Sequence, residues 1–230
     1  LDAVAGIDLN PFAVAIARFR LWVAALRASG VHRLTEAPNF QLNVAIGDSL
    51  LHGARFGMTR TTGMFEGTEH YAGTGLAHAY ASEDLEAVNR ILGRQYHAVV
   101  GNPPYITVKD AALNAAYRER YTSCHMKYSL GVPFTERFFE LAITGNGQPA
   151  GYVGLITANS FMKREFGSKL IEQVLPRLDL THVVDTSGAY IPGHGTPTVI
   201  LFGRHRAPVG DTVRTAMGIK GEPSTPDNPA

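Results

Sequence analysis

The ten residues from Tyr96 to Tyr105, YHAVVGNPPY, constrain the fold of this chain more than any other stretch. The first half is a short apolar run rich in β-branched residues, which is typical of a buried strand. Two consecutive prolines then end the strand, because each fixes φ and lacks an N–H group, and they hold the preceding Asn102 in an extended conformation. A side-chain amide, a proline carbonyl and an aromatic ring are therefore expected at the carboxyl end of a core strand, where open α/β sheets bind ligands.

The chemistry that suits this group is methyl transfer to an exocyclic amine such as that of adenine. The lone pair of this amine is delocalised into the ring, so the nitrogen is a poor nucleophile. Asn102 Oδ1 and the Pro103 carbonyl can each accept one N–H of the amine and so favour its pyramidal form. Tyr105 offers a ring on which the base can stack. A plain Asn-Pro-Pro turn is the alternative, but the position directly after a core strand favours the functional interpretation.

Length and composition limit the other possibilities. A chain of 230 residues has room for one sizeable α/β domain. The net charge of +1 gives no overall basic signature for nucleic acid, although a local patch remains compatible with it. The single cysteine excludes an intramolecular disulfide and a Cys-rich zinc site. The histidines show no metal-binding spacing, and the sequence shows no signal peptide and no long apolar run, so we expect a cytoplasmic protein without a metal and without a membrane partner.

A first acidic candidate is the last residue of the first predicted strand, which spans residues 1–8. Asn10-Pro11 has the form of a helix start, and the helix is predicted to continue to Ala28 and to end at Ser29-Gly30. Asp8 is thereby placed at the carboxyl end of the strand. A carboxylate there can accept hydrogen bonds from both ribose hydroxyls of a nucleoside cofactor. A solvated aspartate at a strand end is the alternative.

A second acidic candidate follows the next predicted strand, at residues 40–47. Asp48 and Ser49 come directly after it. Asp48 is placed to accept a hydrogen bond from the adenine amine of a cofactor, and a main-chain N–H just after it can serve the ring nitrogen. The alternative is a turn or helix-capping aspartate. Because Asp48 ends its strand as Asp8 does, we favour the cofactor role.

The remaining elements are predicted from periodicity and from caps. We expect a helix capped by Ser82 and closed by Gly93, a helix at 133–144, a helix from Phe166 that stops before Pro176, and strands at 151–158, 180–185 and 198–202. Residues 106–126 and the adjoining Lys127 mix basic and aromatic residues. They suit a loop over a phosphate backbone or a flipped base, and a solvated helix at 111–120 fits equally well.

Two further stretches carry weaker predictions. Tyr190 and His194 lie in a glycine-containing loop before the last strand. They are candidates for stacking on the target base, but a plain connecting loop explains them as well. From Arg206 onward the chain has no apolar period, so we expect a flexible tail or linker.

These residues resemble a known family. Asn102-Pro103-Pro104-Tyr105 is similar to the Asn-Pro-Pro-Tyr motif of the N6-adenine DNA methyltransferases that use S-adenosylmethionine, and Gly6–Pro11 resembles their second motif. Residues 157–167 and 185–198 look more narrowly like PglX-type methyltransferases of BREX phage-defence systems, and they are also similar to Eco57I-like restriction–modification methylases. The resemblance runs from about Asp8 to Arg204.

The resemblance implies an α/β, Rossmann-like methyltransferase fold with a mostly parallel sheet and an antiparallel C-terminal hairpin strand. It implies a catalytic domain at residues 1–206 and a tail at 207–230. It also implies S-adenosylmethionine as cofactor, double-stranded DNA as substrate and other defence or restriction subunits as partners. The implied residues are catalytic Asn102, Pro103, Pro104 and Tyr105, cofactor-binding Asp8, Asp48, Ser49 and Asn102, and substrate-binding Tyr105, Lys127, Tyr190 and His194.

The sequence departs from the family pattern in two places. Family members carry a glycine-rich cofactor loop before the ribose-binding acid and a target-recognition domain that is usually C-terminal, and neither is found in these 230 residues. We therefore expect an N-terminally incomplete domain that by itself binds S-adenosylmethionine poorly and reads no DNA sequence. Methylation of RNA or of a protein glutamine remains open, because the same two acceptors can hold any planar amine. A non-catalytic remnant that binds DNA or a partner remains open as well.

Overall fold

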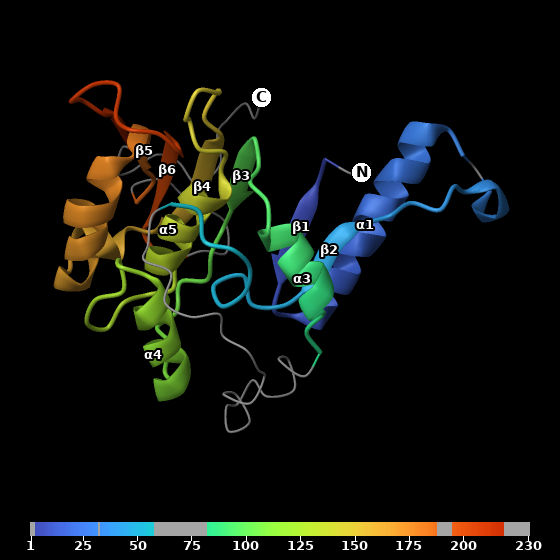
Figure 1. The fold of residues 1–230 in the computed structure, drawn as a ribbon, viewed down its shortest axis with the longest axis horizontal. Helices are drawn as coiled ribbons and strands as arrows, with labels where there is room; N and C mark the ends of the chain where they lie inside the picture. The colour runs from blue at the N-terminus through green and yellow to red at the C-terminus, as the bar shows by residue number, and fades with distance from the viewer. Residues whose placement is uncertain (1–2, 32, 58–81, 188–194, 219–230) are drawn as a thin grey trace. The chain divides into compact units, whose positions relative to one another are not determined.

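The computed structural model describes residues 3–31, 33–57, 82–187 and 195–218. Contacts divide the chain into two compact units, drawn in Figure 1. Unit 1 comprises Leu1–Ala54 and Gly63–Arg94, and unit 2 comprises Arg55–Thr62 and Gln95–Ala230. Each unit has its own sheet and its own helices, and the two are described separately below.

Unit 1 is a parallel strand pair with helices packed against it. Its elements are β1 (Ala5–Asp8), α1 (Pro11–Ser29), a 3₁₀ turn η1 (Leu34–Glu36), β2 (Asn43–Ile46) and α3 (Leu85–Leu92). β1 pairs in parallel with β2, and both α1 and α3 contact these strands. This α/β alternation agrees with the sequence prediction, although both strands are shorter than expected.

The ends of α1 confirm the predicted caps, and the start of α3 corrects one. Asn10 Oδ1 accepts hydrogen bonds from the N–H groups of Phe12 at 2.9 Å and Ala13 at 3.4 Å. Gly30 ends α1 with a φ of 69°, a conformation that costs glycine little. The predicted cap of α3, Ser82, is wrong. Asp84 caps the helix instead by accepting from the N–H of Ala87 at 3.0 Å, because the helix begins one residue after it.

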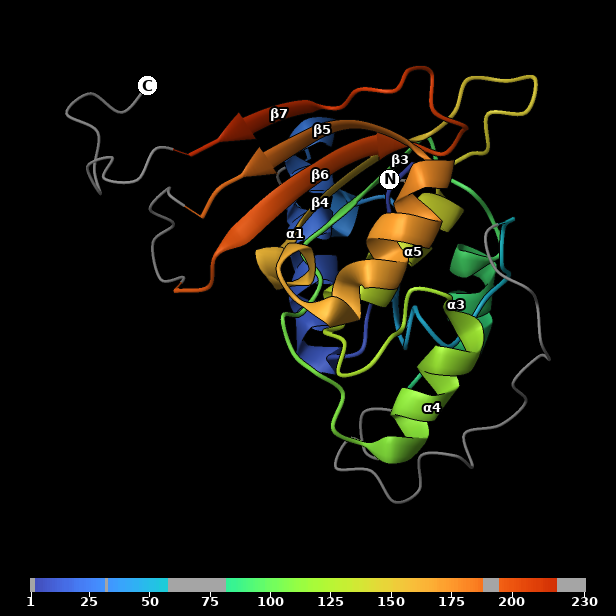
Figure 2. The ribbon, with the colours of Figure 1, turned by 90° about the vertical axis from the view of Figure 1, so that its left-hand side faces the viewer.

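Unit 2 is built on a five-stranded sheet in the order β3-β4-β6-β5-β7, seen from its side in Figure 2. The strands are β3 (Ala98–Gly101), β4 (Tyr152–Ala158), β5 (Asp179–Asp185), β6 (Thr198–Arg204) and β7 (Arg214–Met217). β3 pairs with β4 and β5 with β7 in parallel, whereas β6 is antiparallel to both of its neighbours. The predicted antiparallel C-terminal strand is thereby confirmed.

Among the helices of unit 2, α5 packs against the strand that leads into the candidate site. These helices are α4 (Ala111–Arg120), α5 (Gly131–Leu141), the 3₁₀ segments η3 (Asn159–Met162), η4 (Glu165–Gly167) and η6 (Leu175–Arg177), and one π-helical turn η5 (Leu170–Val174). α5 packs on β3 and β4. The helix predicted from Phe166 is thus broken into short pieces of different pitch.

Three predictions about burial and order need correction. β3 is an edge strand of its sheet and Val100 is 77% exposed, whereas the apolar run predicts a buried strand. α4 has the predicted bounds but is not a solvated helix, because Leu113 and Tyr117 are buried. Within the stretch predicted to be flexible, β7 pairs with β5 through its backbone while all its side chains are exposed. That pairing needs no apolar period, and the domain boundary at 206 stays a prediction.

Candidate active site

The Asn-Pro-Pro-Tyr turn lies directly after β3. Asn102 and Pro104 are exposed, Pro103 is buried, and Tyr105 is half-buried. Partial burial raises the pKa of the Tyr105 phenol above its ordinary value, so this side chain is neutral in the physiological range. The side-chain amide of Asn102 is therefore presented to solvent from a turn whose second residue is fixed in the protein interior.

Unit 2 holds this turn from both sides. Before it, a Cβ on Gly101 would lie 2.7 Å and 2.9 Å from ring carbons of Phe138, so the α5 ring packs directly on the backbone that leads into Asn102. After it, the Ile106 carbonyl accepts a hydrogen bond from the N–H of Leu130 at 2.8 Å, and Thr107 forms a β-bridge with Ser129. Exposed Lys127 belongs to the segment that leads into this bridge. The turn is thus stiffened by packing as well as by its prolines.

In unit 1, the two predicted cofactor aspartates lie at the same edge of the strand pair. Asp8 is the last residue of β1 and is in register with Ile46, and its carbonyl accepts from the N–H of Gly47 at 3.1 Å. The Asp8 carboxylate is exposed, with Oδ1 accepting from the N–H of Asn10 at 2.7 Å. A carboxylate at this position can still accept further hydrogen bonds, because each oxygen has two lone pairs.

Asp48 is 5% exposed and builds the turn after β2. Its Oδ1 accepts from the N–H groups of Leu50 at 2.8 Å and Leu51 at 3.2 Å, and its own N–H donates to Glu83 Oε1 at 2.7 Å. The turn interpretation considered from the sequence therefore applies to Asp48. Its role toward an adenine amine, and that of half-buried Ser49, stay predictions.

The sequence analysis missed the residues that support the Asp48 turn. Glu83 also contacts His52 Nε2 at 3.1 Å, which links the chain after Asp48 to the start of α3. A Cβ on Gly47 would lie 2.5 Å from Val88 Cγ2, so only glycine fits beside α3 at this point. Nothing in the local sequence of Glu83 marks it, because the contact joins residues far apart in the chain.

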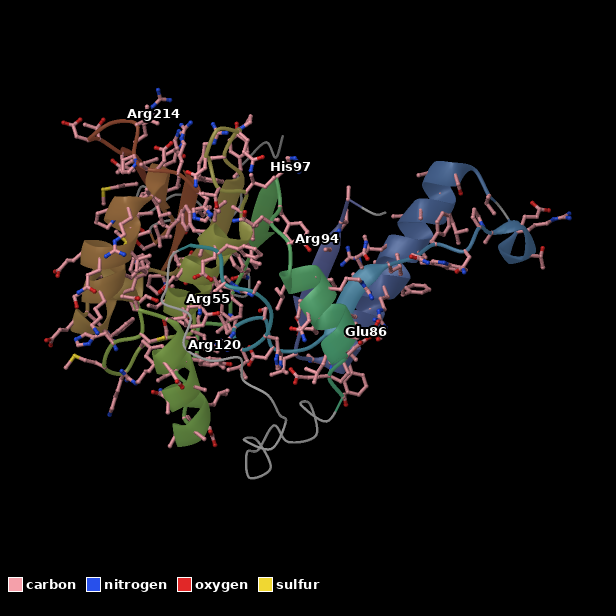
Figure 3. All side chains as sticks on the ribbon, in the orientation of Figure 1. Arg55, Glu86, Arg94, His97, Arg120 and Arg214 are labelled. Carbon is pink, nitrogen blue, oxygen red and sulfur yellow. The ribbon has the colours of Figure 1, made fainter. Side chains whose placement is uncertain are left out.

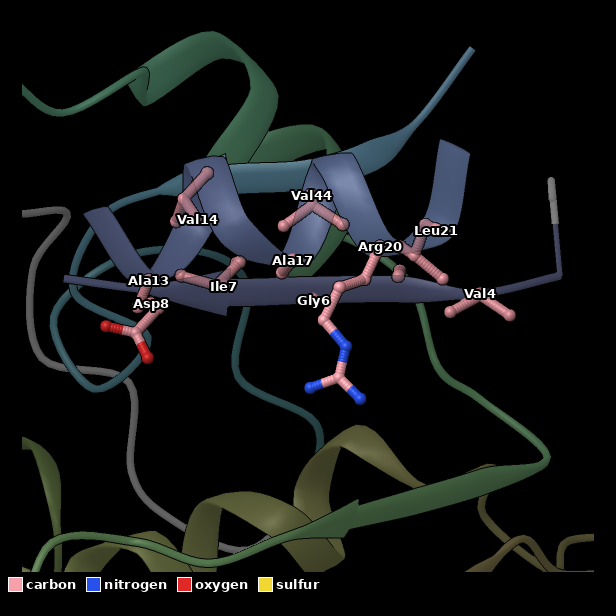
Figure 4. A pocket seen from close by; sticks show the side chains of 11 residues that line it. Val4, Gly6, Ile7, Asp8, Ala13, Val14, Ala17, Arg20, Leu21 and Val44 are labelled. Carbon is pink, nitrogen blue, oxygen red and sulfur yellow. The ribbon is translucent and has the colours of Figure 1, made fainter. Parts of the chain in front are cut away.

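A cavity of about 420 Å³ lies along β1 and α1 (Figure 4). Asp8 and Arg20 supply its charged side chains. The other walls are apolar and include Val4, Ile7, Leu21 and Val44. Asp8 thus places carboxylate oxygens in a hollow whose lining is apolar apart from Asp8 and Arg20.

The structure distributes the predicted site over the two units. Asp8, Asp48 and Ser49 belong to unit 1, whereas Asn102–Tyr105 and Lys127 belong to unit 2. Tyr190 and His194 lie outside the described residues. Among the residues that the structure describes, no group of three His, Cys, Asp or Glu side chains could hold a metal ion, and no helix is long and apolar enough to span a membrane.

The aromatic residues that follow the turn belong to the core. Tyr117, Tyr121 and Tyr128 are buried, so they are not available to stack on a base in this structure. The Arg118 guanidinium lies 5.2 Å from the Tyr128 ring centroid and donates to the carbonyl of Met126. The aromatic residues of this stretch therefore serve mainly in packing, whereas its basic residues Lys109, Arg118 and Lys127 are exposed.

A buried charge cluster in unit 2 was also missed. Arg55, Arg137, Glu136 and Glu140 all have side chains that are at most 5% exposed. One signal was present in the sequence, because Glu136 and Glu140 lie four residues apart, on one face of a helix rich in apolar residues. A carboxylate pair in such a helix needs buried cationic partners.

Comparison with known proteins gives the chain its family. It is 52% identical over 241 residues to the adenine-specific methyltransferase PglX of Streptomyces coelicolor, covering 99% of this chain and 19% of that protein. It is 29% identical over 176 residues to the type II methyltransferase M.PaeR7I of Pseudomonas aeruginosa, covering 70% of this chain and 30% of the relative. The chain thus spans about a fifth to a third of the length of these relatives.

Among solved structures, a putative class I S-adenosylmethionine-dependent methyltransferase from Listeria monocytogenes matches with a TM-score of 0.43 and 13% identity, over 62% of this chain and 45% of that one. The family match is far more extensive, because it covers residues 2–191. The chain belongs to the Eco57I restriction-modification methylase family.

Proposed function

We propose that the protein transfers a methyl group from S-adenosylmethionine to the N6 amine of an adenine that is flipped out of double-stranded DNA. The observation that carries the proposal is the exposed Asn102 amide at the end of β3, in an intact Asn-Pro-Pro-Tyr turn. The family membership and the high identity to an adenine-specific methyltransferase support it. The alternatives of an RNA or protein-glutamine substrate have no such support.

Unit 2 would supply the groups that hold the target amine. Asn102 Oδ1 and the Pro103 carbonyl would each accept one N–H, so the nitrogen lone pair would turn away from the ring and toward the incoming methyl group. Tyr105 would stack on the base, a contact typically worth about 1–3 kcal/mol. The buried ring of Pro103 and the packing of Phe138 on Gly101 would keep these acceptors in place while the base enters.

Unit 1 would hold the cofactor, and the residues present fit it in part. Asp8 has an exposed carboxylate at the rim of the apolar cavity and would accept from the ribose hydroxyls. Asp48, in the turn after β2, would accept from the adenine amine of the cofactor. When bound, S-adenosylmethionine supplies the methyl group, and no basic side chain is needed because the methylated amine readily loses its proton.

We place this activity in a restriction–modification or BREX phage-defence system, because PglX and the type II methyltransferases are the relatives that the chain matches. Other subunits of such a system are the expected partners, and the cytoplasm is the expected location of a DNA-modifying enzyme. Base flipping is required, since the N6 amine is paired inside an intact duplex.

The test compares wild-type protein with Asn102→Ala in the full-length protein. Methylation of duplex DNA is followed by mass spectrometric detection of N6-methyladenine, with single-stranded RNA and a glutamine-containing peptide as parallel substrates. We expect methylated DNA from the wild type only, and nearly unchanged binding of S-adenosylmethionine to Asn102→Ala by calorimetry. Methylation by Asn102→Ala at the wild-type rate would remove Asn102 from the mechanism, and methylation of RNA or peptide alone would replace DNA as the substrate.

A further inference from the structure

The described chain passes between its two units at two points, and both lead to the same part of α5. The first lies between Ala54 and Arg55 and the second between Arg94 and Gln95. In each case the first residue of unit 2 has a long polar side chain. Both side chains bind Glu140, in the last turn of α5. We call Arg55, Gln95 and Glu140 together the α5 anchor.

Arg55 binds the Glu140 carboxylate through two of its nitrogens. Arg55 Nε donates to Oε2 at 2.8 Å and to Oε1 at 3.1 Å, and Nη2 lies 2.5 Å from Oε1. Nη1 donates to the carbonyl of Arg120 at 2.7 Å, and the guanidinium lies 4.2 Å from the centroid of the Tyr121 ring. Figure 3 labels Arg55 and Arg120 within unit 2. Every part of the guanidinium is therefore held, and its side chain is 5% exposed.

The groups around Arg55 raise its pKa despite its burial. Burial alone acts to lower the pKa of Arg55, but Tyr121 and Glu140 outweigh it, and the pKa is raised above its ordinary value. Glu140 also receives Arg137 Nη1 at 3.2 Å, and its side chain is fully buried. Replacing a buried ion pair of this kind by apolar residues of similar volume is often neutral or stabilising. A contribution to stability is thus a weak explanation for the buried Arg55–Glu140 ion pair at the point where the chain enters unit 2.

Gln95 binds the backbone of the same turn of α5. Its Nε2 lies 3.0 Å from the Glu140 carbonyl, 2.9 Å from the Ala142 carbonyl and 3.0 Å from Thr144 Oγ1. The next residue continues the attachment, because the N–H of Tyr96 donates to the Leu141 carbonyl at 2.7 Å. The second entry point is therefore fixed by side-chain and main-chain hydrogen bonds to residues 140–144.

The same helix bears on the catalytic turn. Phe138, two residues before Glu140, packs its ring on Gly101, the residue that precedes Asn102. α5 also packs on β3 and β4. A displacement of the last turn of α5 would therefore also displace Asn102 and both points where the chain enters unit 2.

We propose that Arg55, Gln95 and Glu140 are positioning residues for methyl transfer. The inference rests on the proposed function, in which unit 1 binds the cofactor and unit 2 binds the target amine. Transfer requires the reacting atoms to be held about 3–3.5 Å apart. The α5 anchor fixes both points where the described chain enters unit 2 to the helix that supports Asn102. Loosening the anchor therefore lowers the rate of transfer while each unit still binds its own ligand.

The experiment uses Gln95→Ala and Arg55→Lys in the full-length protein, with Gln148→Ala as the matched control. Gln148 is exposed, and its Nε2 makes only a 3.4 Å contact with the Thr144 carbonyl. Single-turnover methylation is measured well below the melting temperature of each variant, together with the dissociation constants for S-adenosylmethionine and for DNA. We expect the rate to fall about tenfold or more in both anchor variants, since a small misplacement of reacting groups is costly. We expect both dissociation constants to stay within about twofold of the wild type, and Gln148→Ala to behave as wild type.

The outcomes separate this inference from the proposed function. A wild-type protein that methylates no DNA overturns the proposed function and the inference with it. A wild-type protein that methylates DNA, with variants that turn over equally fast or lose activity only through weaker ligand binding, overturns the inference alone. If Arg55→Lys does not fold, Gln95→Ala decides the question, because Gln95 is uncharged and half-buried.

Discussion

Replacing Gly101 by alanine tests whether α5 holds the catalytic turn. The new Cβ would lie 2.7 Å and 2.9 Å from two Phe138 ring carbons, whereas relaxed carbon contacts are about 3.5–4.0 Å. The ring or the strand must therefore move by about 1 Å, and overpacking of this kind costs about 1–3 kcal/mol. Since Asn102 is the next residue, we also expect methylation to slow by up to about 100-fold.

Two comparisons make this prediction specific. In the Phe138→Ala background the clash disappears, so Gly101→Ala should then cost less than about 0.5 kcal/mol, and the coupling energy should be about 1–3 kcal/mol. Gly154→Ala on the neighbouring strand is the control, because its Cβ would meet Phe202 at 3.5 Å and Val100 at 3.7 Å, which are ordinary contacts. Free energies of unfolding come from urea titrations with the m-value checked. An equal cost of Gly101→Ala in both backgrounds, or a cost no larger than that of Gly154→Ala, would refute the packing argument.

Three further predictions concern single side chains. Asp8→Ala should weaken S-adenosylmethionine by about 1–3 kcal/mol in a calorimetric titration of the full-length protein, because the ribose hydroxyls lose their acceptor; an unchanged dissociation constant would remove Asp8 from the cofactor site. Asp48→Asn keeps an oxygen that can accept from Leu50 and Leu51, but it should weaken S-adenosylmethionine about tenfold or more in the same titration, because an NH₂ group then faces the adenine amine. Burial raises the pKa of the Cys124 thiol to about 12, so iodoacetamide at about pH 8.5 should alkylate it only after unfolding by urea. For the same reason stability should fall as the pH rises from the unfolded-state pKa toward 12, because the unfolded state releases the thiol proton first, and fast labelling of the folded protein would contradict the burial.

Local sequence signals predicted most of the helix ends and strands. The Asn10 cap, the αL conformation at Gly30 and the bounds of α4 follow from side chains that act within a few residues, and the structure agrees with each. The strand order could not be read in this way, because pairing depends on residues far apart in the chain. The same holds for β7, whose exposed side chains carry no apolar pattern while its backbone pairs with β5.

The buried charges of unit 2 explain why burial was harder to predict than secondary structure. A glutamate on a helix is normally assigned to solvent, yet Glu136 and Glu140 are fully buried. Arg137 on the same helix is one partner of Glu140, but Arg55 reaches Glu140 from a distant part of the chain, and the N–H of Ser123 donates to Glu136 at 2.9 Å. Only the assembled fold brings these partners to the two carboxylates, so the spacing within α5 does not by itself show that they are buried.

The aspartates at the strand ends show why a turn role and a ligand role cannot be separated by sequence. Asp8, Asp48 and Asp185 each end or closely follow a strand, and in each the Oδ1 atom accepts from the N–H two residues later, at 2.7, 2.8 and 2.9 Å. This hydrogen bond fixes the carboxylate relative to the sheet edge, as in an Asx turn. A carboxylate can accept several hydrogen bonds. The turn hydrogen bond to Oδ1 therefore also fixes the direction of the second oxygen. The local bond that makes aspartate a good turn residue therefore also prepares it to bind a ligand, and only a substitution that keeps the turn while changing the second acceptor can distinguish the two roles.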